Sequence, residues 1–216
     1  MSLLPNKNEL GFFEIRLESI GGLGANLAGK MLAEAGVLGH GLNGSNFSSY
    51  GSEKKGSPVK SFIRFSEQDV EIRDHSPIEE PHIIAVFHEA LYKMVDVVKG
   101  LKPGGIVLVN SARDMDSVRK DLNITGGTLA IVDALGIAVE EKTRVNTAML
   151  GSLFRICDFL DPDVMRTVIK ETFEKKYPHL VEPNLKTFNR GYEEVSFRTF
   201  QSDDVKGEET SLIESG

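Results

Sequence analysis

Residues 12–37 read FFEIRLESIGGLGANLAGKMLAEAGV, and the expected fold follows from this stretch. Residues 12–20 have β-strand character, with partial alternation of apolar and polar side chains. The turn Gly21-Gly22-Leu23-Gly24 follows at once, and residues 25–37 form a helix-like segment rich in Ala and Leu. A strand, a glycine-rich turn and a helix in this order open an α/β unit of the nucleotide-binding type, in which the first amides of the helix can receive an anion.

The turn is an incomplete dinucleotide fingerprint. In the pattern G-x-G-x-x-G, Gly22 and Gly24 fit the first two places, but the third falls on Leu27. Residues 41–47, where an acid would hold a ribose hydroxyl, contain neither Asp nor Glu. Three interpretations stay open: a tight turn for close helix packing, a phosphate turn at Gly21, Gly22 and Gly24, and a dinucleotide site.

The middle of the chain adds strands to the same sheet. Continuous apolar runs at residues 82–87, 106–110 and 129–132 are typical of strands buried on both faces. Residues 59–65 and 68–73 are close enough to form a hairpin, while residues 88–99 and 114–121 read as helices. We expect an α/β fold: a doubly wound, mostly parallel but mixed Rossmann-like sheet, with helices on both faces and a helical C-terminal part.

The C-terminal part should consist of helices. Residues 147–160 place apolar side chains at helical spacing, and Asp161-Pro162 is an N-cap followed by a proline at the first helical position. Residues 185–195 are a further candidate helix. We therefore expect residues 1–195 to form a single domain and residues 196–216 to be a mobile or partner-bound tail.

Residues 36–59, GVLGHGLNGSNFSSYGSEKKGSPV, are rich in Gly and Ser and read as a long loop. Phe47, Tyr50, Lys54 and Lys55 distinguish this segment from a flexible linker. Long loops inside compact domains are usually either functional or disordered. Aromatic and basic side chains on such a backbone favour a contact surface.

Composition limits the function classes. The 216 residues carry a net charge of −7, and the segment after Ser202 holds five acidic residues against Lys206 alone, which disfavours nucleic-acid binding. No apolar run reaches the roughly 20 residues of a membrane span, and the N-terminus has no export signal. The single cysteine, Cys157, excludes an internal disulfide and a cluster held by this chain alone. We expect a cytoplasmic protein without a membrane partner.

The sequence offers no catalytic residues. The five histidines lack metal-ligand spacing, and Cys157 lies on the apolar face of an expected helix. His88 and Glu89 follow a strand, where α/β folds place ligands, but a histidine at a helix start is commonly a cap. Neither a nucleophile elbow nor a P-loop is present. These features fit a subunit better than a free-standing enzyme.

Two motifs carry a resemblance to a known family. The run Ser49-Tyr50-Gly51-Ser52-Glu53-Lys54-Lys55-Gly56-Ser57-Pro58-Val59 matches an S-Y-G-S-E-x-x-G-x-P-V loop, and Asn146-Thr147-Ala148-Met149-Leu150-Gly151 matches N-T-x-M-L-G. With these motifs in the same order and spacing over residues 16–192, the chain resembles the gamma subunit of 2-oxoacid (pyruvate):ferredoxin/flavodoxin oxidoreductases. It departs at Ser19 and Leu23, where that family has Gly and Gln in its first turn.

The resemblance implies a division of labour. Alpha, beta and delta subunits would be the partners, and the complex would use thiamine diphosphate, Mg²⁺, iron–sulfur clusters and coenzyme A. The reaction would be oxidative decarboxylation of pyruvate or a related 2-oxoacid to an acyl-CoA, with electrons passed to ferredoxin or flavodoxin. This chain would hold no cofactor, would be inactive alone, and could form a homodimer when isolated.

The matching loop is our candidate subunit interface, formed by Ser49, Tyr50, Gly51, Ser52, Glu53, Lys54, Lys55, Gly56 and Pro58. Tyr50 would supply a rigid contact, and the two lysines would meet acidic or phosphate groups. In the opposing interpretation, Tyr50 merely packs the loop onto its own domain. Two alternative functions also remain: a stand-alone nucleotide-binding Rossmann-type oxidoreductase or binding protein that uses the glycine turn, and a module of an indolepyruvate, 2-oxoglutarate or oxalate enzyme.

Overall fold

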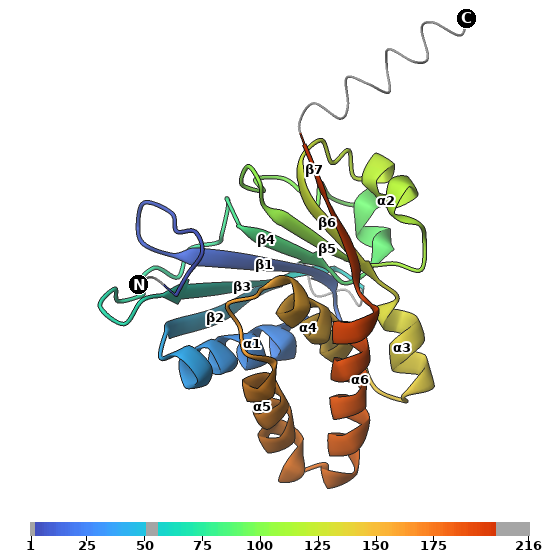
Figure 1. Ribbon diagram of the computed structural model, residues 1–216. Coiled ribbons are helices and arrows are strands. Elements are labelled where there is room, and N and C mark those ends of the chain that lie inside the picture. Colours follow the sequence, from blue (N-terminus) through green and yellow to red (C-terminus); the bar gives the residue numbers. More distant parts are fainter. Residues whose placement is uncertain (1–2, 51–55, 202–216) are drawn as a thin grey trace, which may run out of the picture.

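The computed structural model describes residues 3–50 and 56–201, and these residues form a single mixed sheet with helices on both faces (Figure 1). The spatial order of the strands is β2-β3-β1-β4-β5-β6-β7. β1, β4, β5 and β6 are parallel, whereas β2, β3 and β7 are antiparallel to their neighbours. The strands are β1 Phe13–Ile20, β2 Asn43–Tyr50, β3 Pro58–Ser66, β4 Ile83–Val86, β5 Ile106–Asn110, β6 Gly127–Val132 and β7 Ser196–Phe200.

The helices form two layers. The larger core lies between one face of the sheet and α1, α4, α5 and α6, and the smaller one lies between the other face, α2 and the 3₁₀ turn η1 (Figure 1). The expected α/β class, with its mixed sheet and helical C-terminal part, is therefore confirmed. The helical elements are α1 Ala25–His40, η1 Glu89–Lys93, α2 Met115–Asp121, α3 Ala134–Glu140, α4 Val145–Ile156, α5 Pro162–Glu174, η2 Pro178–Leu180 and α6 Val181–Glu194.

The start of α5 confirms the expected cap. The Asp161 side chain accepts a hydrogen bond from the Asp163 amide at 2.8 Å, and Pro162 occupies the first turn. These contacts satisfy an amide that has no partner within the helix, and the fixed φ of proline suits the first helical position.

The long loop expected over residues 36–59 is wrong for most of its length. α1 continues to His40, and Asn43–Tyr50 forms the edge strand β2, paired with β3. The pairing is supported by a stacked contact between the Phe47 and Phe62 rings, 4.9 Å between centroids. Asn46 Nδ2 also donates to Ser61 Oγ at 2.7 Å. The polar composition of β2 does not indicate a strand, because the contacts that stabilise β2 come from β3, which follows later in the chain.

Two further local predictions are wrong. The short strand expected at residues 68–73 is replaced by a turn in which Ser66 Oγ donates to the Val70 carbonyl at 2.5 Å. Of the helix expected at residues 88–99, only η1 forms. The buried Arg16 guanidinium donates to the carbonyls of Val97 and Lys99, at 3.3 and 2.7 Å, and so holds that backbone in a non-helical path.

The predicted tail beginning at residue 196 is also wrong at its start. Ser196–Phe200 forms β7, antiparallel to β6, and residues 202–216 lie outside the described residues. Phe200 is buried against the smaller core, with the Arg119 guanidinium 4.0 Å from its ring centroid. Only this one side chain of β7 is buried, so the strand lacks the alternating pattern by which strands are recognised.

β1 carries charged residues on the face opposite α1. Glu14, Arg16 and Glu18 alternate along this strand and are all buried. Arg64 Nε of β3 donates to Glu14 Oε1 at 2.8 Å, and Lys60 Nζ lies 3.1 Å from Glu18 Oε1. We call these five residues the charged ladder. The same sheet face is apolar over β4, β5 and β6, where the smaller core lies.

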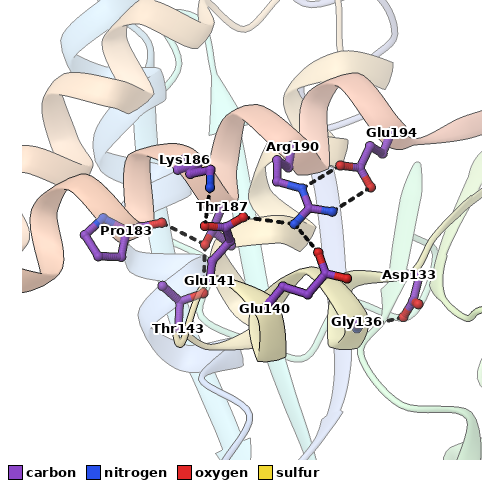
Figure 2. A network of polar contacts seen from close by, with 10 residues as sticks. All are labelled: Asp133, Gly136, Glu140, Glu141, Thr143, Pro183, Lys186, Thr187, Arg190 and Glu194. Carbon is purple, nitrogen blue, oxygen red and sulfur yellow. Dashed lines mark hydrogen bonds and ion pairs between the residues drawn. The ribbon is translucent and has the colours of Figure 1, made fainter.

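A second charged group joins α3 to α6 at the surface. Figure 2 shows the Arg190 guanidinium between three carboxylates, those of Glu140, Glu141 and Glu194, with nitrogen–oxygen distances of 2.6, 2.9 and 2.6 Å. Lys186 Nζ lies 2.9 Å from Glu141 Oε2. We call these five residues the helix network. It fixes the short helix α3 against the longer helix α6.

Candidate functional site

The predicted turn lies at the carboxyl end of β1, the edge at which α/β sheets commonly bind ligands. Gly22 and Gly24 have φ angles of +102° and +83°. The Gly21 amide donates to the Ser57 carbonyl at 3.1 Å, which ties the turn to the segment that enters β3. The glycine turn and the second half of the S-Y-G-S-E motif therefore lie side by side.

The turn also contacts the second motif. Gly24 caps α1, and a Cβ atom at this position would lie 2.9 Å from Cγ of Asn146, at the start of α4. Asn146 is buried. Only glycine satisfies both the left-handed backbone and this close contact. This close contact is with α4, whereas the interpretation as a tight turn expected the helix to pack closely on the sheet. Phosphate binding at Gly21, Gly22 and Gly24 stays a prediction.

A chain of polar contacts holds Tyr50 in place. Ser48 Oγ donates to Asn26 Oδ1 at 2.9 Å, and Asn26 Nδ2 donates to Tyr50 Oη at 3.0 Å. Tyr50 is nevertheless 63% exposed. The hydroxyl is anchored to the start of α1 while the ring faces solvent, so its orientation is fixed before any partner binds. Sequence reasoning missed Asn26, because its partners lie more than 20 positions along the chain.

Most of the N-T-x-M-L-G motif is structural. Thr147 Oγ1 donates to Asn184 Oδ1 of α6 at 2.7 Å, and Met149 and Leu150 are buried in the core. A Cβ at Gly151 would lie 2.0 Å from the Phe188 carbonyl oxygen, so α4 and α6 are in backbone contact there. Only Asn146 reaches the glycine turn.

The predicted interface is partly described. Ser49 and Tyr50 end β2 and are exposed, Gly56 is exposed with a φ of +88°, and Pro58 begins β3 opposite Ile20. The remaining residues of the predicted interface lie outside the described residues: Gly51, Ser52, Glu53, Lys54 and Lys55. The described part places this hairpin at the carboxyl end of β1.

Polar side chains continue along the carboxyl edge over β4 and β5. His88 Nδ1 accepts from the Ala90 amide at 3.0 Å, which confirms its role as a cap. Ser111 Oγ donates to Glu89 Oε1, and Asn110 donates to the Phe87 carbonyl while accepting from the Leu135 amide. Asn110 ends a buried strand and Ser111 directly follows it, and this position is the signal that could have identified them.

Burial shifts the pKa values of two further titratable groups, Cys157 and Tyr92. Burial raises the pKa of the Cys157 thiol, which lies in the core as expected. Burial, together with the nearby Glu89 carboxylate, raises the pKa of Tyr92. In the described part of the chain no group of three or more His, Cys, Asp or Glu could hold a metal ion. Every helix described is too short or too polar to span a bilayer.

The arrangement joins backbone, amide and aromatic groups from three segments. Three segments meet at one end of the sheet: the glycine turn, the hairpin between β2 and β3, and the start of α4. Within residues 3–50 and 56–201 they present an anchored aromatic ring, exposed glycine backbone and neutral amides. Preorganised aromatic groups of this kind carry much of the binding energy at protein interfaces.

Comparison with known proteins gives a consistent result. The family model described as "Pyruvate ferredoxin/flavodoxin oxidoreductase" matches residues 14–194. "Pyruvate synthase subunit PorC" of Thermotoga maritima is 37% identical over 187 residues, covering 85% of this chain and 95% of that protein. "Pyruvate/ketoisovalerate oxidoreductases common subunit gamma" of Thermococcus kodakarensis is 37% identical over 162 residues, covering 74% and 86%.

The fold has a solved counterpart of the same kind. The crystal structure of pyruvate oxidoreductase subunit PORC from Thermotoga maritima superposes with a TM-score of 0.75 at 33% identity, and the match covers 87% of this chain and 98% of that one. Coverage of nearly the whole counterpart means that the sheet and both helix layers are shared.

Proposed function

Because the chain belongs to the pyruvate ferredoxin/flavodoxin oxidoreductase family, we propose that it is the gamma subunit of a 2-oxoacid oxidoreductase complex. Its partners are alpha, beta and delta subunits, and the complex converts pyruvate or a related 2-oxoacid into an acyl-CoA in the cytoplasm. Electrons leave through ferredoxin or flavodoxin.

In this proposal the cofactors are held by other subunits. The chain has one cysteine, which is buried, and cysteine ligation of an iron–sulfur cluster requires several thiolates. Thiamine diphosphate with Mg²⁺ would supply the decarboxylation chemistry when bound on the partner subunits. The residues of this chain would position those subunits.

One observation supports a docking role at the carboxyl edge: Tyr50 is anchored through its hydroxyl and exposed through its ring. An exposed tyrosine with a free hydroxyl would pay rotamer entropy on binding, whereas a pinned one pays less. The opposing interpretation, that Tyr50 only packs its own domain, explains the bond to Asn26 but not the exposure of the ring. Lys54 and Lys55 would add contacts to acidic or phosphate groups.

The test compares two exposed tyrosines. Tyr50→Ala should weaken assembly with the alpha, beta and delta subunits by roughly tenfold or more, as expected for an interface aromatic. Tyr177→Ala is the matched control, because Tyr177 is 52% exposed and lies at the start of η2. Affinity is measured with the immobilised chain, and unfolding in urea verifies that both variants remain folded. The affinity of Lys55→Ala for the other subunits is measured in the same way.

Turnover is measured in the assembled complex as dye reduction that depends on coenzyme A and a 2-oxoacid. A panel of pyruvate, ketoisovalerate, 2-oxoglutarate and indolepyruvate identifies the substrate by the highest turnover. Wild-type assembly and wild-type turnover of Tyr50→Ala would refute the docking role. Substrate turnover by the isolated chain would instead support a stand-alone oxidoreductase.

A further inference from the structure

A cleft opens at the opposite end of the sheet, at the amino ends of β1, β4 and β5. Its volume is about 610 Å³, within the range of small-molecule sites. It lies between the N-terminal segment around Lys7, the turn around Lys102 and the end of α4 at Ile156. The eight-residue strand β1 separates it from the docking edge by roughly 25 Å.

One wall of the cleft is aromatic. Phe13 and Phe159 line it and meet edge to face, with centroids 5.1 Å apart. Ile156 also lines it. These side chains can bury the apolar body of a small ligand, and flat rings suit an aromatic or branched aliphatic group.

His82 supplies a polar group in this wall. Its ring stacks on Phe13 at a centroid distance of 4.7 Å, and the residue is only 8% exposed. Nδ1 accepts the Glu14 amide at 3.0 Å, so in the neutral ring the proton must be on Nε2. Among the described residues Nε2 has no hydrogen-bond partner, although the side chain lines the cleft. Nε2 is therefore a donor that a ligand in the cleft can reach.

Two lysines lie at the rim. Lys102 Nζ is 3.2 Å from Glu80 Oε2, and Lys7 Nζ is 3.9 Å from Glu67 Oε1, which is beyond hydrogen-bond distance. Lys7 is exposed and able to turn towards the cleft. Among the described residues that line the cleft, Asp158 is a carboxylate without a cationic partner, whereas Glu80 is paired with Lys102. Of the two rim lysines, Lys7 is the more exposed and makes the longer ion pair, so it is the one that can turn to an anionic ligand.

We propose that this cleft is a binding site for a small carboxylate with an apolar body, whose oxygen accepts a hydrogen bond from His82 Nε2. The carboxylate lies between His82 and Lys7, and the apolar body lies against Phe13 and Phe159. The site is distinct from the docking edge and does not depend on the function proposed for that edge.

The experiment titrates the isotope-labelled full chain with three probes: phenylacetate, 3-phenylpropionate and 4-methylpentanoate. We expect saturable changes in the amide signals of Phe13, Lys102 and Gly105, and a shift of the His82 ring nitrogen signals, with at least one probe. Phenylacetamide, which keeps the ring and an acceptor oxygen but has no charge, should bind roughly tenfold more weakly than phenylacetate.

Substitutions of His82 and Lys7 test separately what each side chain contributes to ligand binding. His82→Asn keeps an acceptor near the Glu14 amide but removes the Nε2 donor, and should weaken binding roughly tenfold. Lys7→Met should weaken it several-fold, whereas Lys30→Met on α1 is the matched control and should leave it unchanged. If His82→Asn fails to fold, the ring nitrogen signals of the wild-type chain and Lys7→Met still decide the question.

Several results would overturn the proposal. These are the absence of saturable changes around the cleft with all three probes, equal binding of phenylacetate and phenylacetamide, or a His82 ring signal that does not respond. Equal binding by folded His82→Asn and the wild-type chain would also overturn it.

Discussion

The charged ladder on β1 and β3 and the helix network on α3 and α6 use the same chemistry in different surroundings. In the ladder, the side chains of Arg16, Glu18 and Arg64 are at most 4% exposed. In the network, Arg190 is 24% exposed and Glu140 is 65% exposed (Figure 2). Buried charges are costly unless fully paired, whereas exposed pairs contribute little to stability. The two groups should therefore respond differently to mutation.

Hydrogen bonds to backbone carbonyls offset the free-energy cost of burying the charged ladder. The Arg16 guanidinium donates to the carbonyls of Ile78, Glu79, Val97 and Lys99, while its Nε is in ionic contact with Glu18 at 2.8 Å without hydrogen-bond alignment. Arg64 binds both Glu14 and the Asp74 carbonyl. These contacts hold two loops against the part of this sheet face that lies over β1 and β3, away from α2, so we infer that the ladder replaces an apolar core on this half.

Arg64→Met should give the largest effect. Among the described residues it leaves the buried Glu14 carboxylate with only the Asn8 amide as a side-chain donor, and breaking a buried pair costs about 3–5 kcal/mol. Urea unfolding measures the loss. Arg198→Met is the matched control, because its pair with Asp116 is exposed and should contribute less than about 1 kcal/mol.

The double variant Glu14→Leu with Arg64→Met sharpens this result. Removing both charges leaves neither one unpaired, so the loss should be much smaller than for Arg64→Met alone. A single-variant loss below about 1 kcal/mol would mean that water reaches Glu14 and that the ladder behaves like the surface network.

The next largest effect is a pH dependence of the free energy of unfolding, caused by His82, which accepts the amide of Glu14 at the amino end of the charged ladder. Burial, and secondly the Lys102 charge, lower the pKa of His82 to about 4. The unfolded chain therefore takes up this proton near its ordinary pKa of about 6.5, before the folded chain does. The stability from neutral His82 is complete above about pH 6.5 and is lost as the pH falls towards 4, by about 3 kcal/mol.

Urea unfolding between pH 7 and pH 4.5 measures this loss, and the difference between the wild-type chain and His82→Asn isolates it from the carboxylates. Identical slopes in the two proteins would show that His82 is protonated in the folded state at a normal pKa.

The comparison also shows which features the sequence could predict. Strands β4, β5 and β6 are buried on both faces and therefore appear as continuous apolar runs, and the start of α5 carries Asp161-Pro162. These signals are local. Glu14, Arg16 and Glu18 alternate with apolar residues, a pattern typical of a strand with one solvated face. Their burial depends on Arg16 reaching carbonyls 62 to 83 positions away.

The candidate site divides in the same way. The glycine turn and the two family motifs were found because each is a continuous segment. Their contact through Gly24 and Asn146, and the anchoring of Tyr50 by Asn26, join segments that only the folded sheet brings together. The cleft around His82 was missed for the same reason, since its walls come from segments as far apart in the sequence as Pro5 and Phe159.

The smallest effect is expected in the helix network. Lys186 and Arg190 lower the pKa of Glu141, and Arg190 and Glu194 lie one helical turn apart on α6. Arg190→Gln should nevertheless cost only about 1 kcal/mol, because the group remains hydrated and each exposed pair contributes little.

The salt dependence of the two stability losses tests whether the helix network is hydrated and the charged ladder is not. Raising the ionic strength to about 1 M shortens the screening length to about 3 Å and should abolish most of the Arg190→Gln loss, while the Arg64→Met loss persists because water and ions do not reach Glu14. Unfolding of both variants and the wild-type chain at low and high salt measures this. If Arg190→Gln still lowers the free energy of unfolding at high salt, the helix network is shielded from water and ions. The charged ladder and the helix network would then differ in their place in the fold but not in their hydration.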